Sequence, residues 1–460
     1  MVPYCTSFFS VVLQVGACFI LGECSNPGTH GTSESSPNLQ PEAKEEQSIP
    51  EDSGFNEINR RIYKVLSATH PCRDIEACET VEVTLKPKNP KPQSIGQRIL
   101  VIDDGMVLPA YTRYKSRVID HIFPFDDGSY QSFPSTIKVP IPVFQVLSQI
   151  LDEEFPDTTA RELDPVAKLF YKHKKVLNVE NVEHGDENFS TLADLNPYAE
   201  FLLAGRPAMT KEIFCSTRKD KASFEKYRAF LHSTANSLRS YIEKYEINYI
   251  NMSFGETTET MKADWSRLCS NQPFPSNAFF RLLLKTYFEE FLQTLFAANA
   301  IFVHSAAYST QELSLSHPDF YCDCQEIPNR IRVTGFSSSV SHLPLTGAEA
   351  PELLQARMFG SLPCADLAVN FGVEANRPWA DGPFPVFMTA DGVGVESVGK
   401  FVSTSSAAPI VLSYINYLKQ AGIISGEGAE FVSNLKKYHT GRFIEPARYR
   451  QFELYRLGRQ

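Results

Sequence analysis

Short apolar runs that end in polar residues recur along the chain from residue 97 onward. Residues 99–102 are Ile-Leu-Val-Ile, and this run stops at Asp103-Asp104-Gly105. Runs that turn polar only at their carboxyl end are typical of central parallel strands, which are buried on both faces. The same pattern predicts four more strands, at residues 247–252, 300–303, 331–335 and 367–371.

Segments with helical periodicity alternate with these runs. Residues 222–245 are amphipathic, residues 277–298 are strongly apolar, and residues 405–421 form a third predicted helix. The third helix has Pro409 in its first turn and Gly422 just past its end, where each residue is tolerated. The alternation predicts an α/β fold with a doubly wound, mainly parallel sheet and helices on both faces.

Several polar residues that could do chemistry lie where predicted strands end or where a predicted helix begins. Asp103, Ser253 and His304 each come at or just after the end of an apolar run. Ser405 starts a helix, where backbone N–H groups are free and the helix dipole is positive. That position suits a nucleophile, because its own N–H can help to hold an oxyanion. The alternative interpretation is an N-cap serine on a closely packed helix.

Three segments resemble the motifs of the subtilisin-like serine proteases, or subtilases. Their serine motif, Gly-Thr-Ser-x-Ala-x-Pro, is matched at four positions of 404–409. Their aspartate strand, Val-Ile-Asp-x-Gly, is matched at four positions of 101–105, and Ile-Asn-Met-Ser-hydrophobic-Gly is matched throughout 250–255. The resemblance covers about residues 95–425 and includes the chain order Asp, His, Ser. It implies a subtilisin-like fold and a serine endopeptidase.

The resemblance also implies a role for each member of a catalytic triad. Ser405 would attack the scissile carbonyl and form an acyl-enzyme, and His184 would carry the proton to the leaving amine. Asp103 would orient His184 and stabilise its charged form. The expected partner is therefore a protein or peptide substrate.

Substrate and oxyanion contacts are expected nearby. An extended substrate would pair with the backbone of Ser253, Phe254 and Gly255, which is strand addition. The oxyanion candidates are the N–H of Ser405 and the side chain of Tyr308, which stands where the family has an Asn. Loss of one oxyanion donor typically costs about 3 kcal/mol of transition-state stabilisation. The alternative function is therefore a catalytically impaired binding protein of the same fold.

Other acidic and histidine residues could also supply the acid or the base of the triad. Asp104 is predicted to point away from Asp103, because successive strand residues face opposite sides. Asp120-His121 also follows a Val-Ile pair but lacks the glycine, and His304 lies at a predicted strand end. The match to Val-Ile-Asp-x-Gly favours Asp103 as the acid of the triad.

The sequence departs from the family pattern at two motif positions. Ser403 replaces the glycine of the serine motif, and residues 186–188, Asp-Glu-Asn, stand where the family has small and apolar residues. His184 is still favoured because Gly185 follows it and the chain order fits. An α/β-hydrolase esterase is disfavoured, because Ser405 has no Gly-x-Ser-x-Gly elbow and follows the histidine in the chain.

Composition narrows the function classes. The 460 residues are 43% hydrophobic and 21% charged, which argues against wholesale disorder and against a polytopic membrane protein. The net charge is −10 and no basic stripe stands out, so neither nucleic acid nor an anionic membrane surface is expected as a partner.

The N-terminal segment predicts export, to the exterior, the periplasm or the cell envelope. The first 22 residues contain no charged side chain, and residues 8–21 are mostly apolar, although a positive start is missing. Residues 15–18, Val-Gly-Ala-Cys, weakly resemble a bacterial lipoprotein cleavage site, which would anchor the protein through an N-terminal lipid. The predicted division is 1–24 for the signal, 25–94 for a linker and N-terminal extension, 95–425 for the peptidase domain and 426–460 for a C-terminal extension.

Cysteines and metal ligands give weaker signals. Of ten cysteines, seven lie beyond the apolar stretch, so at least one is outside an internal disulfide. Cys72 and Cys78 are close enough to pair, whereas Cys322 and Cys324 are too close for an ordinary bridge. Calcium stabilises many subtilases, but no dense Asp/Asn loop is present, so no metal or other cofactor is predicted.

Overall fold

The computed structural model describes thirteen segments of the chain. The predicted signal (1–24), Gly105, Tyr308, Ser403 and the Cys72–Cys78 pair lie outside them. The described residues are 80–85, 97–104, 117–132, 135–140, 184–196, 198–207, 209–307, 317–337, 357–358, 364–370, 386–389, 392–395 and 404–439.

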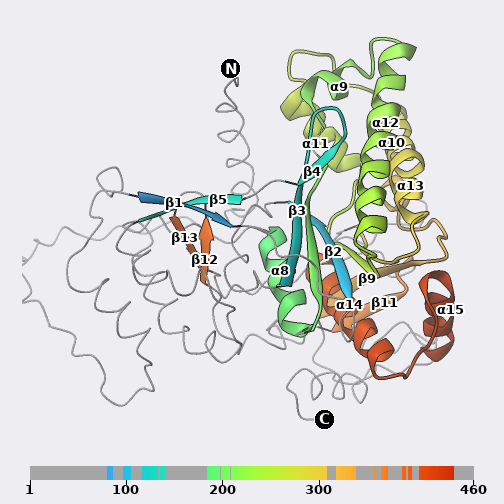
Figure 1. Ribbon diagram of the computed structural model, residues 1–460. Helices are drawn as coiled ribbons and strands as arrows, with labels where there is room; N and C mark the ends of the chain where they lie inside the picture. Colours follow the sequence, from blue (N-terminus) through green and yellow to red (C-terminus); the bar gives the residue numbers. More distant parts are fainter. Residues whose placement is uncertain are drawn as a thin grey trace, which may run out of the picture. The chain divides into compact units, whose positions relative to one another are not determined.

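A nine-stranded, mostly parallel sheet forms the centre of the described fold (Figure 1). Its strands are β2 (Arg98–Asp103), β3 (Val118–Pro124), β4 (Tyr130–Ser132), β6 (Glu200–Gly205), β7 (Tyr249–Met252), β8 (Ile301–Ser305), β9 (Arg330–Ser337), β10 (Arg357–Met358) and β11 (Leu367–Asn370). The order is β10-β9-β8-β7-β2-β6-β3-β4, with β11 also beside β9. Only β4 and β10 pair antiparallel within this sheet. The α/β class with a mainly parallel sheet is thus confirmed.

Helices cover both faces of the sheet. One face carries α8 (His184–Leu195) and α14 (Thr404–Gln420), which also contact each other. The other carries α10, α11 and a continuous helical stretch from α12 through a π-helical turn to α13. The bounds are α9 (Lys211–Ser216), α10 (Lys221–Lys244), α11 (Thr258–Leu268), α12 (Asn277–Thr286), the π-helical turn (Tyr287–Leu292), α13 (Gln293–Phe296) and α15 (Gly428–Tyr438).

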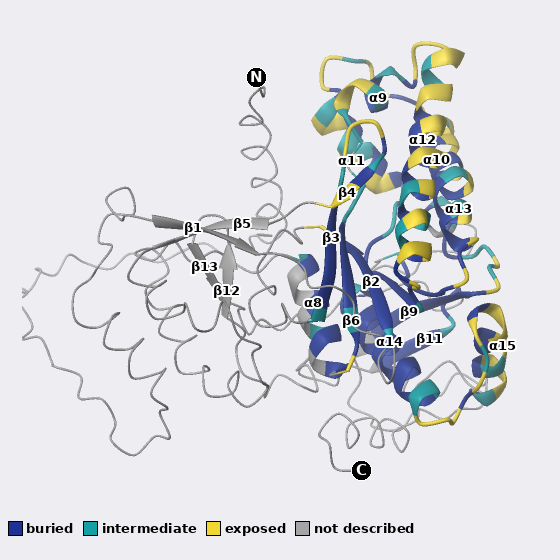
Figure 2. Cartoon of the chain, viewed as in Figure 1, coloured by how far each residue is buried: buried dark blue, intermediate teal, exposed yellow. Residues whose placement is uncertain are grey.

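Strand β2 shows how the core sets the direction of the candidate aspartate. Leu100 and Ile102 belong to the core cluster that α10–α13 cover. Because side chains alternate along a strand, Ile99, Val101 and Asp103 face the other side, where α8 contacts β2. All six residues of β2 are buried, as its dark blue colour shows in Figure 2. The carboxylate of Asp103 therefore has to find its partners on the α8 side.

The predicted helices are confirmed with small shifts at their ends. Residues 222–245 correspond to α10, which begins after Asp220, whose side chain accepts a hydrogen bond from Ser223 N at 2.7 Å. Gly422 follows α14 with a φ of 68°, a left-handed conformation that favours glycine.

The predicted place of Pro409 in the first turn of its helix is wrong, because α14 already begins at Thr404. Pro409 therefore lies inside the helix, beyond its first turn. Proline has no N–H to donate to the carbonyl four residues earlier, which here belongs to Ser405.

Smaller elements join the predicted extensions to the central part. β1 (Thr80–Leu85), in the predicted N-terminal extension, pairs antiparallel with β5 (Ser135–Pro140). β12 (Val386–Thr389) and β13 (Gly392–Val395) form a hairpin that contacts β5. The helix α15, in the predicted C-terminal extension, contacts β8 and β9. Strand pairing and helix packing thus continue across both predicted boundaries.

Two disulfides stabilise the described part of the chain. Cys215–Cys269 joins the last turn of α9 to the end of α11, and Cys324–Cys364 joins the segment before β9 to the segment before β11. Cys322 is buried and not in a disulfide. Cys322 and Cys324 do not bridge each other, which the sequence predicts from their spacing.

Candidate active site

The strand order reverses direction between β2 and β7 in the middle of the sheet. From β2 the chain goes to β3 on one side, and from β7 it goes to β8 on the other, although β2 and β7 are neighbours. In open α/β sheets such a reversal leaves a crevice outside the carboxyl ends of the two strands, where ligands bind. Asp103 is the last residue of β2 and Ser253 directly follows β7.

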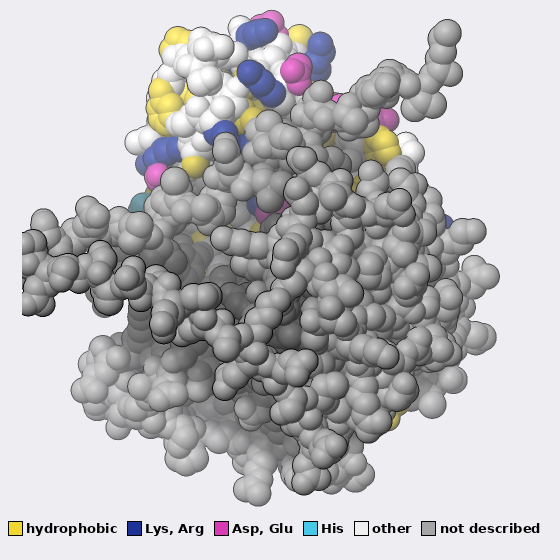
Figure 3. Space-filling model, turned by 90° about the vertical axis from the view of Figure 1, so that its left-hand side faces the viewer, with side chains coloured by type: hydrophobic (Ala, Val, Ile, Leu, Met, Phe, Trp, Pro, Cys, Tyr) yellow, Lys and Arg dark blue, Asp and Glu magenta, His cyan; other side chains and the backbone are white. Residues whose placement is uncertain are grey.

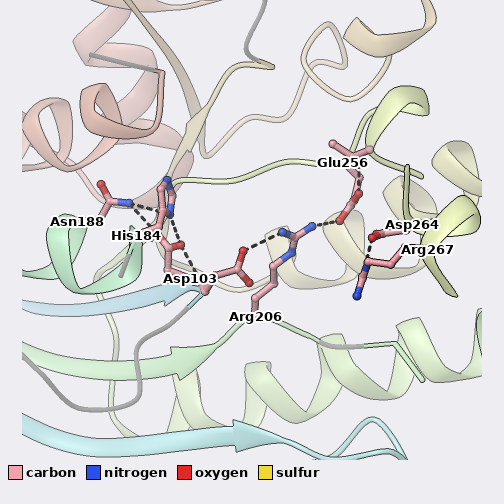
Figure 4. A network of polar contacts seen from close by, with 9 residues as sticks. Asp103, His184, Asn188, Arg206, Glu256, Asp264 and Arg267 are labelled. Atoms are coloured by element: carbon pink, nitrogen blue, oxygen red, sulfur yellow. Dashed lines mark hydrogen bonds and ion pairs between the residues drawn. The ribbon is translucent and has the colours of Figure 1, made fainter. Parts of the chain in front are cut away.

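Asp103 and His184 meet at the carboxyl end of β2. His184 is the first residue of α8, and its Nδ1 lies 2.6 Å from Asp103 Oδ1 (Figure 4). Gly185 N donates to Asp104 O at 2.9 Å, which fixes the start of α8 against the end of β2. The Asp103 side chain is fully buried, whereas 30% of the His184 side chain is exposed. The imidazole is therefore held on a buried acid and still reachable from outside.

Two further donors hold the Asp103 carboxylate. The backbone N–H of Asp104 donates to Oδ1 at 2.7 Å, and Asn188 Nδ2 donates to Oδ2 at 2.9 Å. The main chain is fixed as well, because Arg206 N donates to Asp103 O at 2.8 Å. The carboxylate thus has defined partners at both oxygens.

The charges around His184 favour its protonated form. Burial lowers the pKa of His184, but the charge and hydrogen bond of Asp103, with a contribution from Asp104, outweigh burial and raise it above the usual value. Arg206 opposes this increase. A neutral His184 that donates Nδ1–H to Asp103 keeps Nε2 as a proton acceptor, which is the tautomer a general base needs.

Ser405 lies in the first turn of α14, half-buried. The far end of α14 is at the amino end of β7, because Lys419 Nζ lies 6.0 Å from the ring centroid of Tyr249. A helix of 17 residues is about 25 Å long, so Ser405 is placed toward the carboxyl edge. Within the described residues, however, no hydrogen bond joins the Ser405 hydroxyl to His184.

The predicted substrate segment follows β7. Ser253 is buried and its hydroxyl accepts a hydrogen bond from Asn251 Nδ2 at 3.0 Å. Phe254 O lies 3.0 Å from His304 Nε2, and a Cβ on Gly255 would lie 3.4 Å from the same nitrogen. His304 therefore supports this backbone from the neighbouring strand β8.

His304 is not a second base of the site. Burial, followed by the charge of Arg330 and then of Arg332, lowers the pKa of His304 to about 3. The imidazole is neutral near pH 7, and its contact with Phe254 O requires a proton on Nε2. The contact of His304 holds the backbone of Phe254, within the predicted substrate segment.

Arg206 is a site residue that the sequence analysis missed. Its guanidinium forms an ion pair with Glu256 (Figure 4). It also donates to Asp104 Oδ2 at 3.0 Å and lies over the ring of Phe254 at 4.6 Å. Burial lowers the pKa of Arg206, but Glu256 and Asp104 outweigh this and raise it. Asp104 thus points to Arg206, whereas Asp103 contacts His184. The choice of Asp103 as the acid of a triad stays a prediction.

Of the remaining rival pair, Asp120 contacts residues of β4 and the end of α10. Asp120 lies in β3, where its Oδ2 accepts a hydrogen bond from Tyr245 OH at 2.6 Å and its Oδ1 accepts one from the Ser132 hydroxyl. These contacts tie β3 to β4 and to the end of α10.

The oxyanion candidate Tyr308 lies outside the described residues, but the residue before it is anchored. Ala307 N donates to Asp323 Oδ2 at 2.7 Å. Burial raises the pKa of Asp323 to about 6. The hydrogen bond from Ala307 N and the charges of Arg330 and Arg332 act in the opposite direction but are outweighed.

Neither a metal cluster nor a membrane span appears in the described part of the chain. No three His, Cys, Asp or Glu residues there are arranged to hold a metal ion. None of its helices is both long and apolar enough to cross a bilayer. Where described residues are visible in Figure 3, basic, acidic and hydrophobic side chains are interspersed.

Comparison with known proteins assigns no family. The chain matches no protein-family model and no curated protein.

Proposed function

We propose that this protein is a serine endopeptidase with a subtilisin-like fold. The observation that carries the proposal is the 2.6 Å contact between Asp103 and His184 at the carboxyl end of β2. A buried carboxylate that holds a partly exposed imidazole is the arrangement that the acid and base of a catalytic triad need, which supports the proposal. Ser405, at the start of the helix that packs on α8, supplies the third residue type in the expected chain order.

Peptide hydrolysis then proceeds in two steps. Ser405 Oγ attacks the scissile carbonyl carbon while His184 Nε2 takes the hydroxyl proton. The tetrahedral intermediate collapses to an acyl-enzyme as His184 returns that proton to the leaving amine. Water, deprotonated by His184, hydrolyses the ester and regenerates Ser405. Asp103 stabilises the imidazolium that forms in each step.

The substrate would lie along the segment after β7. The backbone of residues 253–255 would pair with an extended peptide. His304 of β8 holds this backbone through its contact with Phe254 O. The N–H of Ser405 at the start of α14 and the side chain of Tyr308 are the proposed oxyanion donors. Cleavage preference would depend on side-chain pockets beside this strand.

Export is part of the proposal. The disulfides Cys215–Cys269 and Cys324–Cys364 are typical of proteins that reside in oxidising compartments. This agrees with the signal predicted at residues 1–24, and the cysteine at position 18 keeps the lipid-anchored form open.

A fluorophosphonate probe tests the catalytic role directly. The wild-type protein should be labelled at Ser405 and should hydrolyse an unfolded protein substrate. Ser405→Ala should abolish both, and Asp103→Asn should slow both strongly, because it removes the charge that stabilises the imidazolium. Ser266→Ala, at an exposed serine of α11, is the control that should stay labelled. Labelling that persists in Ser405→Ala would overturn the assignment of the nucleophile.

A second candidate function is peptide binding without catalysis. The observation that favours it is the lack of a Ser405–His184 hydrogen bond among the described contacts. Catalytic hydrogen bonds are often long before substrate binds, so geometry alone does not decide. Peptide binding by a wild-type protein that neither reacts with the probe nor cleaves substrate would support this second function.

A further inference from the structure

Asn188 shares one face of α8 with His184. The two residues are four apart, so they lie one above the other on the helix. Asn188 is buried, at 2% exposure, and its Nδ2 lies 2.9 Å from Asp103 Oδ2 and 3.4 Å from His184 Nδ1. Figure 4 shows its amide turned toward both partners. A single turn of helix therefore contacts Asp103 twice, once through each residue.

The chemistry of the contact fixes the orientation of the amide. An ionised carboxylate only accepts hydrogen bonds, so the amide NH₂ and not the amide oxygen must face Asp103. Asp103 Oδ1 already has His184 and the Asp104 N–H as donors. Among the described residues, Asn188 is the donor to Oδ2. A buried acceptor left without a donor is costly, so this bond matters for the state of the acid.

The contact also has a geometric consequence. The carboxylate can rotate about its bond to Cβ, and contacts at one oxygen alone leave that rotation less defined. The Asn188 amide holds the second oxygen, so the plane of the carboxylate is fixed. Because Asn188 and His184 are on the same helix, one element holds both oxygens of the Asp103 carboxylate.

We propose that Asn188 is a positioning residue of the triad, which fixes the Asp103 carboxylate so that Oδ1 faces His184 Nδ1. This inference rests on the proposed peptidase function. It also accounts for the polar residue at position 188, where the resemblance to subtilases leads one to expect a small or apolar residue.

Two substitutions of opposite character test the proposal through the ionisation of His184. Asn188→Leu removes the donor at similar volume, so Asp103 is held less well and the pKa of His184 should fall. Asn188→Asp adds a carboxyl group beside the pair, so the pKa of His184 should rise. The other charged groups that act on His184, Asp104 and Arg206, remain unchanged in both variants.

The pKa is measured by NMR titration of the imidazole, whose signal is identified by its absence in His184→Ala. Asn196→Leu is the matched control, because Asn196 is also a buried Asn at α8 but bonds to α14. It should leave the pKa of His184 unchanged. Asn188→Leu should also lower kcat about 10- to 100-fold with KM changed less than about twofold.

The outcomes separate this inference from the peptidase proposal. If neither Asn188 variant moves the pKa of His184 beyond the Asn196→Leu control, Asn188 is merely structural and the inference is overturned, whether or not the protein cleaves peptides. If the pKa moves in the two expected directions but the wild-type protein has no peptidase activity, the positioning role stands and the peptidase proposal fails.

Discussion

Asn196, the residue after α8, donates a 2.7 Å hydrogen bond from its side chain to Ser413 Oγ of α14, and Asn416 Nδ2 returns a 2.7 Å bond to Asn196 Oδ1. All three side chains are buried. This polar clamp joins the helix that begins with His184 to the helix that carries Ser405. The two helices are therefore joined by a contact at the end of α8 that is opposite to His184.

Asn196→Leu should break the clamp and lower the free energy of unfolding by about 2 to 4 kcal/mol, because it leaves buried partners on α14 unsatisfied. Fluorophosphonate labelling of Ser405 should also slow. Urea unfolding and labelling rates measure the two effects. Asn434→Ala, which removes a solvent-exposed bond to Ser425 O, is the control and should change stability by less than about 1 kcal/mol. An equal decrease in the free energy of unfolding in Asn196→Leu and Asn434→Ala would contradict a stabilising role for the clamp.

The pH dependence of activity should reflect the ion pair beside the triad. Activity requires neutral His184, whose pKa is raised, so kcat/KM should increase with pH on its acid side through a value above 6.5. Asp104 raises this pKa and Arg206 lowers it. Asp104→Asn should therefore move the acid limb to lower pH, and Arg206→Met should move it to higher pH.

The control for the ion-pair experiment is Arg267→Met. Arg267 pairs with Asp264 at 2.8 Å in the same region of Figure 4, but it does not contribute to the pKa shift of His184. The rise of kcat/KM with pH in Arg267→Met should coincide with that of the wild type. A shift of the same sign in Asp104→Asn and Arg206→Met would contradict this electrostatic account.

The sequence predicted those elements whose patterning is local. β2 is apolar from Ile99 to Ile102 between two charged residues, and α10 has a clear polar and apolar face, so the sequence predicted both. β6 was missed because its apolar run is only the four residues 201–204, between Glu200 and Gly205, and no family motif marks it. Arg206 follows β6 directly and was missed with it.

A contact of the candidate site could be predicted from the sequence only where family motifs marked both of its residues. Asp103 and His184 are 81 residues apart, and it was the resemblance of the flanking motifs that paired them. The bond from Asn188 to Asp103 and the ion pair from Arg206 to Glu256 had no such signal, because they depend on how strands and helices are placed in space. Periodicity gives the face of a helix, but it does not give the residue that this face meets.

The disulfide Cys215–Cys269 should contribute strongly to stability. It closes a segment with a sequence separation of 54 residues, and a loop of that length corresponds to about 4 kcal/mol of unfolded-state entropy. Replacing both cysteines by Ala should lower the free energy of unfolding by about that amount in urea. Cys322→Ala is the control for loss of a buried cysteine side chain without a bridge. A double variant no less stable than this control would contradict the expectation.

Asp323 should make stability fall as the pH rises toward neutrality. Burial raises its pKa from 3.8 to about 6 in the folded protein, so the native state binds the proton more tightly than the unfolded state. The stabilisation is fully present below the unfolded pKa and is lost as the pH rises through about 6, which amounts to about 3 kcal/mol. Asp323→Asn keeps an oxygen to accept the Ala307 N–H but cannot ionise.

The measurement is urea unfolding of both proteins between pH 4 and 7, at intervals of about half a unit. The stability of Asp323→Asn minus that of the wild type should increase with pH across this range. His304, whose lowered pKa acts with the opposite sign because its contribution is lost on acidification, is present in both proteins and cancels in the difference. A difference that stays constant from pH 4 to 7 would show that Asp323 does not titrate there. The anchor of Ala307, next to the proposed oxyanion residue Tyr308, would then be a carboxylate throughout this pH range.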